Sequence, residues 1–195
     1  GECHFNAMKG RARPCAVNPL CMHENEFELT PAKESKRVLV IGAGPGGMKA
    51  AAAAAQRGFD VALWEKNDYM GGIMAAAGAP RFKKDVKDQV EYLIRQVYKN
   101  KIDVCLGKTA TLEDVKEYNP DFVVVATGAN PVVIPVPGYE KPNVSTAVPV
   151  LLKQRAVGQR VVVVGGGEVG CELSTELYMP VSYTHLRAHE TVLDL

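Results

Sequence analysis

The sequence lacks the features of several large classes of protein. Its 195 residues hold one tryptophan, and no apolar run approaches the roughly 18 residues that a membrane-spanning helix needs. Lysines and arginines number 23 against 22 acidic residues, and the resulting formal net charge of +1 argues against a nucleic-acid-binding surface. We therefore expect a soluble protein that binds neither membrane nor nucleic acid.

Cysteine is scarce and irregularly spaced. The five cysteines form no C-x-x-C pair, which argues against a disulfide exchanger of the thioredoxin-reductase kind. Their spacing is also unlike a secreted disulfide framework, and the first residues show no basic segment followed by an apolar leader. The cytoplasm is the expected compartment.

Glycine is the most informative residue, because it forms two turns of the same kind. Each turn follows a run of aliphatic residues, and the two read Gly42-Ala43-Gly44-Pro45-Gly46-Gly47 and Gly165-Gly166-Gly167-Glu168-Val169-Gly170. A continuous β-branched run predicts a buried parallel strand. G-x-G-x-x-G after it predicts a tight turn, close approach of the backbone to a pyrophosphate, and a helix N-terminus directed at the phosphates. The duplication predicts two nucleotides.

The first unit shows the expected order of elements. Residues 37–41 predict a strand, residues 46–57 an alanine-rich helix with Gly58 as its C-cap, and residues 59–64 a second strand. Glu65 follows this strand, 23 residues after Gly42, where a dinucleotide-binding unit places a carboxylate that accepts the ribose hydroxyls. The alternative is a solvent-facing glutamate at a strand end. The duplicated turn favours ribose binding.

Further elements complete an α/β pattern. Gly71-Gly72 predicts another close-approach turn, residues 83–99 an amphipathic helix, residues 102–106 a short strand and residues 112–118 a short helix. Residues 122–126 predict a buried strand that ends in Thr127-Gly128. A proline-rich stretch up to Pro142 then predicts an irregular crossover between domains.

The second unit opens at Arg160 and is short. Its helix starts near Glu168 and stops at Pro180, and residues 181–195 fit neither a strand nor a helix extension. The expected fold is therefore α/β, with a Rossmann-like domain built on a parallel sheet and a truncated second Rossmann-like unit.

These motifs resemble those of the two-dinucleotide-binding-domain flavoproteins. The resemblance implies that the first glycine turn binds FAD and the second NAD(P)H. It implies an FAD-binding domain over residues 37–142, incomplete at its C-terminal part, and the start of an NAD(P)H-binding domain over residues 143–180. The implied cofactor contacts are Gly42, Ala43, Gly44, Pro45, Gly46, Gly47, Glu65, Lys66, Gly72, Thr127 and Gly128 for the first nucleotide, and Gly165, Gly167, Glu168 and Gly170 for the second.

Within that superfamily, Cys15-Ala-Val-Asn18-Pro19 resembles the last iron–sulfur ligand of the old yellow enzyme-like NADH:flavin oxidoreductases, the 2,4-dienoyl-CoA reductase family. Eleven residues separate Cys3 from Cys15, as between the third and fourth cluster cysteines of that family. The resemblance implies that residues 1–36 are a partial ligand loop and linker, with Cys3 and Cys15 as two ligands of a [4Fe-4S] cluster. The other two ligands and an FMN-binding barrel would lie upstream. Isolated cysteine pairs are more often idle thiols, and the other three cysteines read as small apolar residues.

The resemblance also implies an electron relay in the intact enzyme. Electrons would pass from NAD(P)H through FAD and the [4Fe-4S] cluster to FMN, which would reduce a double bond of a small-molecule enoate or enoyl thioester. The 195-residue chain would position cofactors, so it holds no candidate general acid or base and is expected to be inactive alone. We expect Gly42→Val to abolish FAD retention by filling the space of the pyrophosphate.

Other interpretations stay open. The chain could be a relative of the NADPH oxidoreductase module of the glutamate synthase small subunit, or a non-catalytic nucleotide-binding fragment. Residues 181–195 resemble a translated sequencing adapter, and we expect them to be non-native. Their two histidines, His185 and His189, lack a third ligand, so no metal site is expected there. NADH or NADPH use, the substrate and a homo-oligomeric state are left open.

Overall fold

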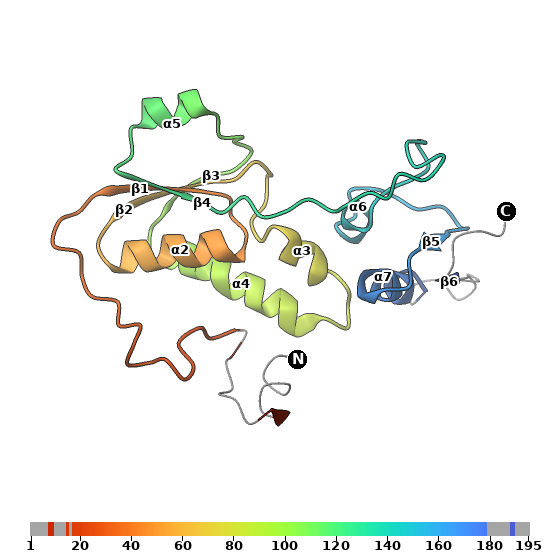
Figure 1. The fold of residues 1–195 in the computed structure, drawn as a ribbon, viewed down its shortest axis with the longest axis horizontal. Coiled ribbons are helices and arrows are strands. Elements are labelled where there is room, and N and C mark those ends of the chain that lie inside the picture. Colours follow the sequence, from red (N-terminus) through yellow and green to blue (C-terminus); the bar gives the residue numbers. More distant parts are fainter. Residues whose placement is uncertain (1–7, 10–14, 16, 179–187, 190–195) are drawn as a thin grey trace.

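A parallel sheet forms the centre of the N-terminal unit (Figure 1). The computed structural model describes residues 8–9, 15, 17–178 and 188–189. The sheet has the order β3-β2-β1-β4, with bounds Asp103–Cys105, Asp60–Trp64, Arg37–Ile41 and Phe122–Val125. In its register Ile41 lies opposite both Trp64 and Val125, so the carboxyl ends of three strands meet at one edge. Ligands of open α/β sheets bind outside this edge.

Helices cover both faces of the sheet, as Figure 1 shows. Helices α2 (Pro45–Gln56) and α4 (Lys84–Lys99) lie on one face, where they bury the side chains of alternate strand residues such as Val40 and Leu63. Helix α5 (Leu112–Tyr118) lies on the other, over Leu39 and Trp64. Alternation of side chains along each strand divides the core in this way.

The alanine-rich helix packs closely on the sheet, as predicted. Ala51 and Ala52 are buried in α2 beneath the strands. The helix ends at Gln56 with Arg57 as its C-cap, so the prediction of Gly58 as the C-cap is wrong by one residue. Gly58 takes the next position, with a positive φ of 91° that glycine adopts without a steric penalty.

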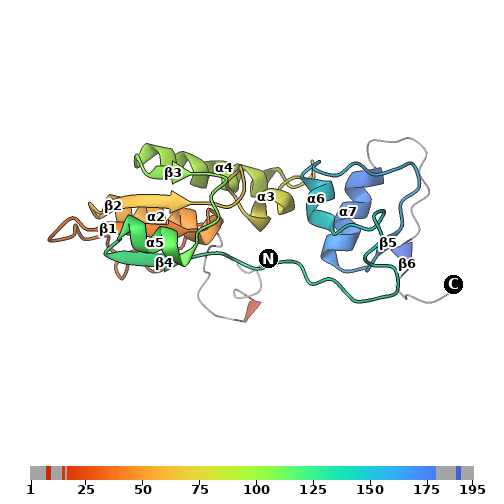
Figure 2. The same ribbon diagram turned by 90° about the horizontal axis from the view of Figure 1, so that it is seen from above.

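The chain then crosses to a second, smaller unit. Residues 126–146, all of them described, contain no helix or strand, which confirms the predicted irregular connection. Beyond it lie α6 (Ala147–Leu151), β5 (Val163–Val164), α7 (Glu168–Tyr178) and β6 (Ala188–His189). Figure 2 shows α6 and α7 beside the short helix α3 (Ile73–Ala77) of the first unit.

Two ion pairs join the units. Lys83 pairs with Glu172 of α7, and the Arg81 Nε lies 3.6 Å from a carboxylate oxygen of Glu176. The backbone N–H of Arg81 also donates to Glu176, at 3.1 Å. The segment before α4 therefore contacts one face of α7.

Three expectations about strands are wrong. Strand β4 was expected to be buried, yet Val125 is 71% exposed because β4 lies at one edge of the sheet, with β1 as its single neighbouring strand among the described residues. The second unit's first strand is only the two residues of β5. Ala188 and His189, in the segment expected to fit no strand, pair in parallel with β5, which has no other strand beside it in the described chain. The domain boundaries and the foreign origin of residues 181–195 stay predictions.

None of the described helices is both long and apolar enough to cross a membrane.

Candidate functional site

The first glycine turn joins β1 to α2, and its glycines serve different purposes. Gly42 has a φ of 105°, and a Cβ atom there would overlap the carbonyl oxygen of Ala126. A Cβ atom at Gly47 would overlap the carbonyl oxygen of Gly42. In contrast, no atom lies within 4 Å of a Cβ built at Gly44. The outer glycines thus let the backbone segments pack, and the middle glycine borders open space.

This assignment corrects the reason given for Gly42→Val. The substituted side chain would meet the backbone of Ala126 and Thr127, not the space beside the helix N-terminus. Its first effect would be on the contact between β1 and β4.

The N-terminus of α2 is free to face a phosphate. Gly44 is its N-cap and supplies no side-chain cap, and Pro45 is at the first turn, where its missing N–H costs no hydrogen bond. The first turn contains no acidic residue. No acidic side chain within this turn therefore offsets the partial positive charge at the start of the 12-residue helix, which suits an anion-binding helix end.

Glu65 lies at this turn and is almost completely buried, with 5% of its surface exposed. Its Oε2 accepts a hydrogen bond from the N–H of Ala43 at 2.7 Å. Its Oε1 accepts two from Asn67, one from the backbone N–H at 2.9 Å and one from Nδ2 at 2.7 Å. The solvent-facing alternative for Glu65 is therefore wrong. A carboxylate offers about four acceptor positions, so Oε2 retains one for a ligand hydroxyl.

Other predicted residues gather beside the first turn. Gly71 donates its N–H to the carbonyl of Ala43 at 2.8 Å, and a Cβ atom at Gly72 would lie 3.1 Å from the Cα of Gly44. Gly71-Gly72 thus forms a turn that lies against the first glycine turn, and its approach to a cofactor stays a prediction. On the other side, Thr127 follows Ala126 against Gly42, and Gly128 has a φ of 70°. Lys66 follows Glu65 and is exposed.

The second glycine turn repeats the geometry of the first. Gly165 has a φ of 110°, and a Cβ atom at Gly170 would overlap the Gly165 carbonyl oxygen. A Cβ atom at Gly167 would meet open space, as at Gly44. Glu168 is exposed and opens α7, so here an acidic side chain stands in the first turn. The structure thus places the predicted residues of the two nucleotides in two separate turns.

The proposed iron–sulfur ligands are described only in part. Cys3 lies outside the described residues. Cys15 is half-buried, and its Sγ accepts a hydrogen bond from the N–H of Asn18 at 3.3 Å. Among the described residues, no group of three or more histidine, cysteine or acidic side chains is placed to hold a metal ion.

The remaining cysteines differ from one another. Cys105 is half-buried and packs against the core on the α5 face, as a small apolar residue would. Cys21 is also half-buried. Cys171 is exposed, with its Sγ 3.3 Å from the Gly166 carbonyl oxygen, so it is not a core residue. Its place in the first turn of α7 explains the difference, because that face of the helix is uncovered.

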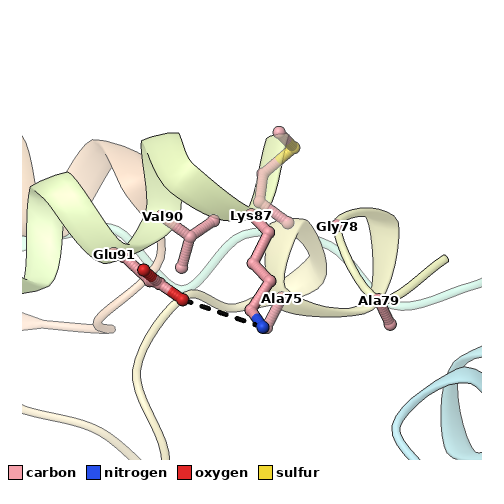
Figure 3. A pocket seen from close by; sticks show the side chains of 7 residues that line it. Ala75, Gly78, Ala79, Lys87, Val90 and Glu91 are labelled. Atoms are coloured by element: carbon pink, nitrogen blue, oxygen red, sulfur yellow. Dashed lines mark ion pairs between the residues drawn. The ribbon is translucent and has the colours of Figure 1, made fainter. Parts of the chain in front are cut away.

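A cavity of about 250 Å³ lies between α3 and α4 (Figure 3). An ion pair of Lys87 and Glu91, 3.9 Å apart, stands beside it. The lining residues are Met74, Ala75, Gly78, Ala79, Lys87, Val90 and Glu91, none of which was a predicted contact.

Sequence reasoning missed Asn67. An asparagine two residues beyond a strand is an ordinary turn residue, and no motif distinguishes it. Only the fold shows that both of its donors meet the Glu65 carboxylate.

Comparison with known proteins supports the assignment of both turns. The family model described as pyridine nucleotide-disulphide oxidoreductase matches residues 36–194. The chain is 40% identical over 158 residues to a cinnamate reductase of Clostridium sporogenes, and 39% identical over 181 residues to an NADH oxidase of Thermoanaerobacter brockii. These matches cover 81% and 88% of this chain but 24% and 28% of the relatives, so the chain spans about a quarter of their length.

One solved structure is similar in fold to both units of the chain together. A 2-naphthoyl-CoA reductase in complex with 2-naphthoyl-CoA matches with a TM-score of 0.84 and 31% identity, over 91% of this chain and 27% of that one. The resemblance to the enoate-reductase-like flavoproteins is thereby confirmed. The chain belongs to the pyridine nucleotide-disulphide oxidoreductase family and corresponds to the FAD- and NAD(P)H-binding module of enoate-reductase-like flavoproteins.

Proposed function

We propose that this chain is the electron-transfer module of an iron–sulfur flavoprotein oxidoreductase. In the intact enzyme, FAD would convert the two-electron hydride of NAD(P)H into single electrons, which a [4Fe-4S] cluster would deliver to FMN for reduction of a double bond. A small-molecule enoate or enoyl-thioester substrate and a cytoplasmic location are part of this proposal. Its support is the similarity to a cinnamate reductase and a 2-naphthoyl-CoA reductase. The glutamate-synthase-like alternative is not better supported by these relatives.

The buried Glu65 carboxylate carries the FAD assignment. Its Oε2 has one acceptor position left after the hydrogen bond from Ala43, which suits a ribose hydroxyl. A ribose 2′-phosphate would bring a second negative charge to this carboxylate, so the pocket favours a nucleotide with free hydroxyls. The open space at Gly44 and the uncapped end of α2 suit a pyrophosphate.

The second turn is proposed to hold the pyrophosphate of NAD(P)H. Gly167 would let the backbone approach it, as Gly44 does in the first turn. Glu168 would contribute through its backbone at the start of α7, since its carboxylate and a phosphate repel each other.

For the cluster, the chain offers Cys15 with an N–H donor already directed at its sulfur. Hydrogen bonds to ligand sulfurs tune the potential of iron–sulfur clusters, so this loop fits a cluster ligand. In the full-length protein we expect Cys15→Ser to lower the content of iron and acid-labile sulfide, and Cys21→Ser to leave it unchanged. Equal content in both variants would contradict the ligand assignment.

FAD binding can be measured on the purified chain through its single tryptophan. Trp64 ends β2 next to Glu65, so bound flavin should quench its fluorescence. We expect saturable quenching by FAD and a dissociation constant at least about tenfold higher for Glu65→Gln, which loses a charged acceptor. Glu117→Gln, at an exposed position of α5, is the control and should bind as the wild type does. A wild-type chain that fails to bind FAD would refute the assignment.

A further inference from the structure

Asn67 hydrogen-bonds the Glu65 carboxylate but is not one of the predicted cofactor contacts. We infer that Asn67 is a positioning residue, which fixes this carboxylate so that Oε2 is the oxygen available to the adenosine ribose. The inference rests on the proposed role of Glu65 in FAD binding. In this role Asn67 orients the Glu65 carboxylate and does not itself contact the cofactor.

Both donors of Asn67 meet the same oxygen. The backbone N–H lies 2.9 Å from Oε1 of Glu65, and the side-chain Nδ2 lies 2.7 Å from it. The N–H of Ala43 meets the other oxygen at 2.7 Å. Rotation of the carboxylate would break all three hydrogen bonds at once. In the described part of the chain, no other side chain donates to this carboxylate.

Asn67 is itself held by the segment that follows β3. Its carbonyl accepts the N–H of Gly107 at 2.9 Å, and the backbone of Glu65 is bonded to Cys105 at 2.9 Å and to Lys108 at 2.8 Å. Hydrogen bonds at Glu65 and at Asn67 therefore hold the backbone that carries the side-chain amide of Asn67. This arrangement orients a buried charge at low entropic cost when a ligand arrives.

Removal of the side-chain donor should weaken FAD binding without changing the fold. Asn67→Ala keeps the backbone N–H and loses Nδ2, so Oε1 retains one donor and the carboxylate is less restrained. The expected dissociation constant for FAD is about tenfold higher, the size of one hydrogen bond to a charged group.

Asn67→Asp gives a signature that a structural role would not. Two carboxylates would then face each other, and one would have a raised pKa, because like charges at this distance disfavour ionisation of both. At acidic pH the shared proton would restore a hydrogen bond to Oε1. The charged groups on the packed segments are Lys66 and Asp68, which flank residue 67, and Lys108, which pairs with Asp114.

Trp64 quenching by FAD should be titrated at pH 5.5, 7 and 8 for the full 195-residue chain and these variants. Relative to wild type, Asn67→Asp should bind roughly a hundredfold more weakly at pH 8 and within about tenfold at pH 5.5. Asn67→Ala should show the same deficit at every pH. Thermal unfolding of each chain without FAD reports any loss of fold.

Asn100 supplies the matched control. Its Nδ2 donates to the Gln96 carbonyl at 2.7 Å, and it is half-buried like Asn67, but it caps α4 far along the chain from Glu65. Asn100→Ala and Asn100→Asp should lower the unfolding temperature about as much as the corresponding Asn67 variants do. They should leave the affinity for FAD unchanged at every pH.

The outcomes separate this inference from the proposed function. A wild-type chain without FAD affinity overturns both. A wild-type chain that binds FAD, together with Asn67 variants that match it or that show no pH dependence for Asn67→Asp, overturns only the role of Asn67. Equal loss of affinity in the Asn100 variants would likewise overturn it, since the effect would then follow stability.

Discussion

Two alanine substitutions in the first glycine turn should separate folding from nucleotide binding. Gly47→Ala adds a methyl group between α2 and the turn, whereas Gly44→Ala adds one in open space. The glycines are three residues apart in one motif, and a sequence motif alone does not tell their roles apart.

The structure sets the size of the first effect. A Cβ atom at Gly47 would overlap the Gly42 carbonyl oxygen and lie 3.3 Å from the Cβ of Ala126. Backbone atoms cannot move aside by changing rotamer, so overpacking should cost about 3 kcal/mol. The better helix propensity of alanine offsets up to about 1 kcal/mol. The net loss of about 2 kcal/mol corresponds to a fall of roughly 4–8 °C in the unfolding temperature.

The second substitution should leave the fold nearly intact. Gly44 has φ −71° and ψ 177°, which alanine adopts without strain, and no atom lies within 4 Å of the added methyl group. The cost is the poorer N-cap preference of alanine, below about 1 kcal/mol. The methyl group would stand where the backbone is expected to approach the pyrophosphate. We expect the dissociation constant for FAD to rise at least about thirtyfold, a loss of roughly 2 kcal/mol.

Circular dichroism of the chain without FAD measures the first effect, and Trp64 quenching by FAD measures the second. Gly44→Ala that binds FAD as tightly as wild type would show that the open space at Gly44 does not receive the cofactor. Gly47→Ala with an unchanged unfolding temperature would show that α2 can move away from Gly42, against the packing described above.

Three further predictions concern stability. Hydrogen bonds from the Thr111 hydroxyl and the Lys108 ammonium lower the pKa of Asp114 from 3.8 to about 2. The ionised Asp114 therefore stabilises the fold above about pH 4, and this stabilisation is lost as the pH falls through about 2. Asp114→Asn should unfold at a lower temperature than wild type at pH 6, and the two unfolding temperatures should converge near pH 2. A double-mutant cycle of Lys83→Gln and Glu172→Gln should give a coupling of about 0.5–1 kcal/mol in urea unfolding that shrinks at high salt, and no coupling at low salt would contradict an ion pair between the units. Leu63→Ala, at a fully buried site, should cost about 2–5 kcal/mol in the same assay, whereas Val125→Ala, at a site 71% exposed, should change stability by less than about 0.5 kcal/mol.

Local sequence patterns were sufficient to predict most of the helices and strands. Helix α5 has the predicted bounds, and β1 and α4 agree with their predictions to within a residue, because period and punctuation by glycine are local properties. The environment of β4 was not predictable in this way. Its valines are as β-branched as those of β1, and only the strand order shows that it lies at an edge.

The candidate site likewise has features that the local sequence predicts and features that depend on the tertiary structure. The sequence by itself determined that two nucleotide turns exist and that Glu65 follows the second strand, because strand, turn and carboxylate occur at a fixed spacing. Only the tertiary structure decided that Glu65 is buried, that Asn67 and Ala43 hold its two oxygens, and that Gly44 alone among the three motif glycines of the first turn borders open space. The physical reason is that burial and hydrogen bonding depend on segments distant in the chain, such as Ala126 and Gly107, which the parallel sheet brings to one edge.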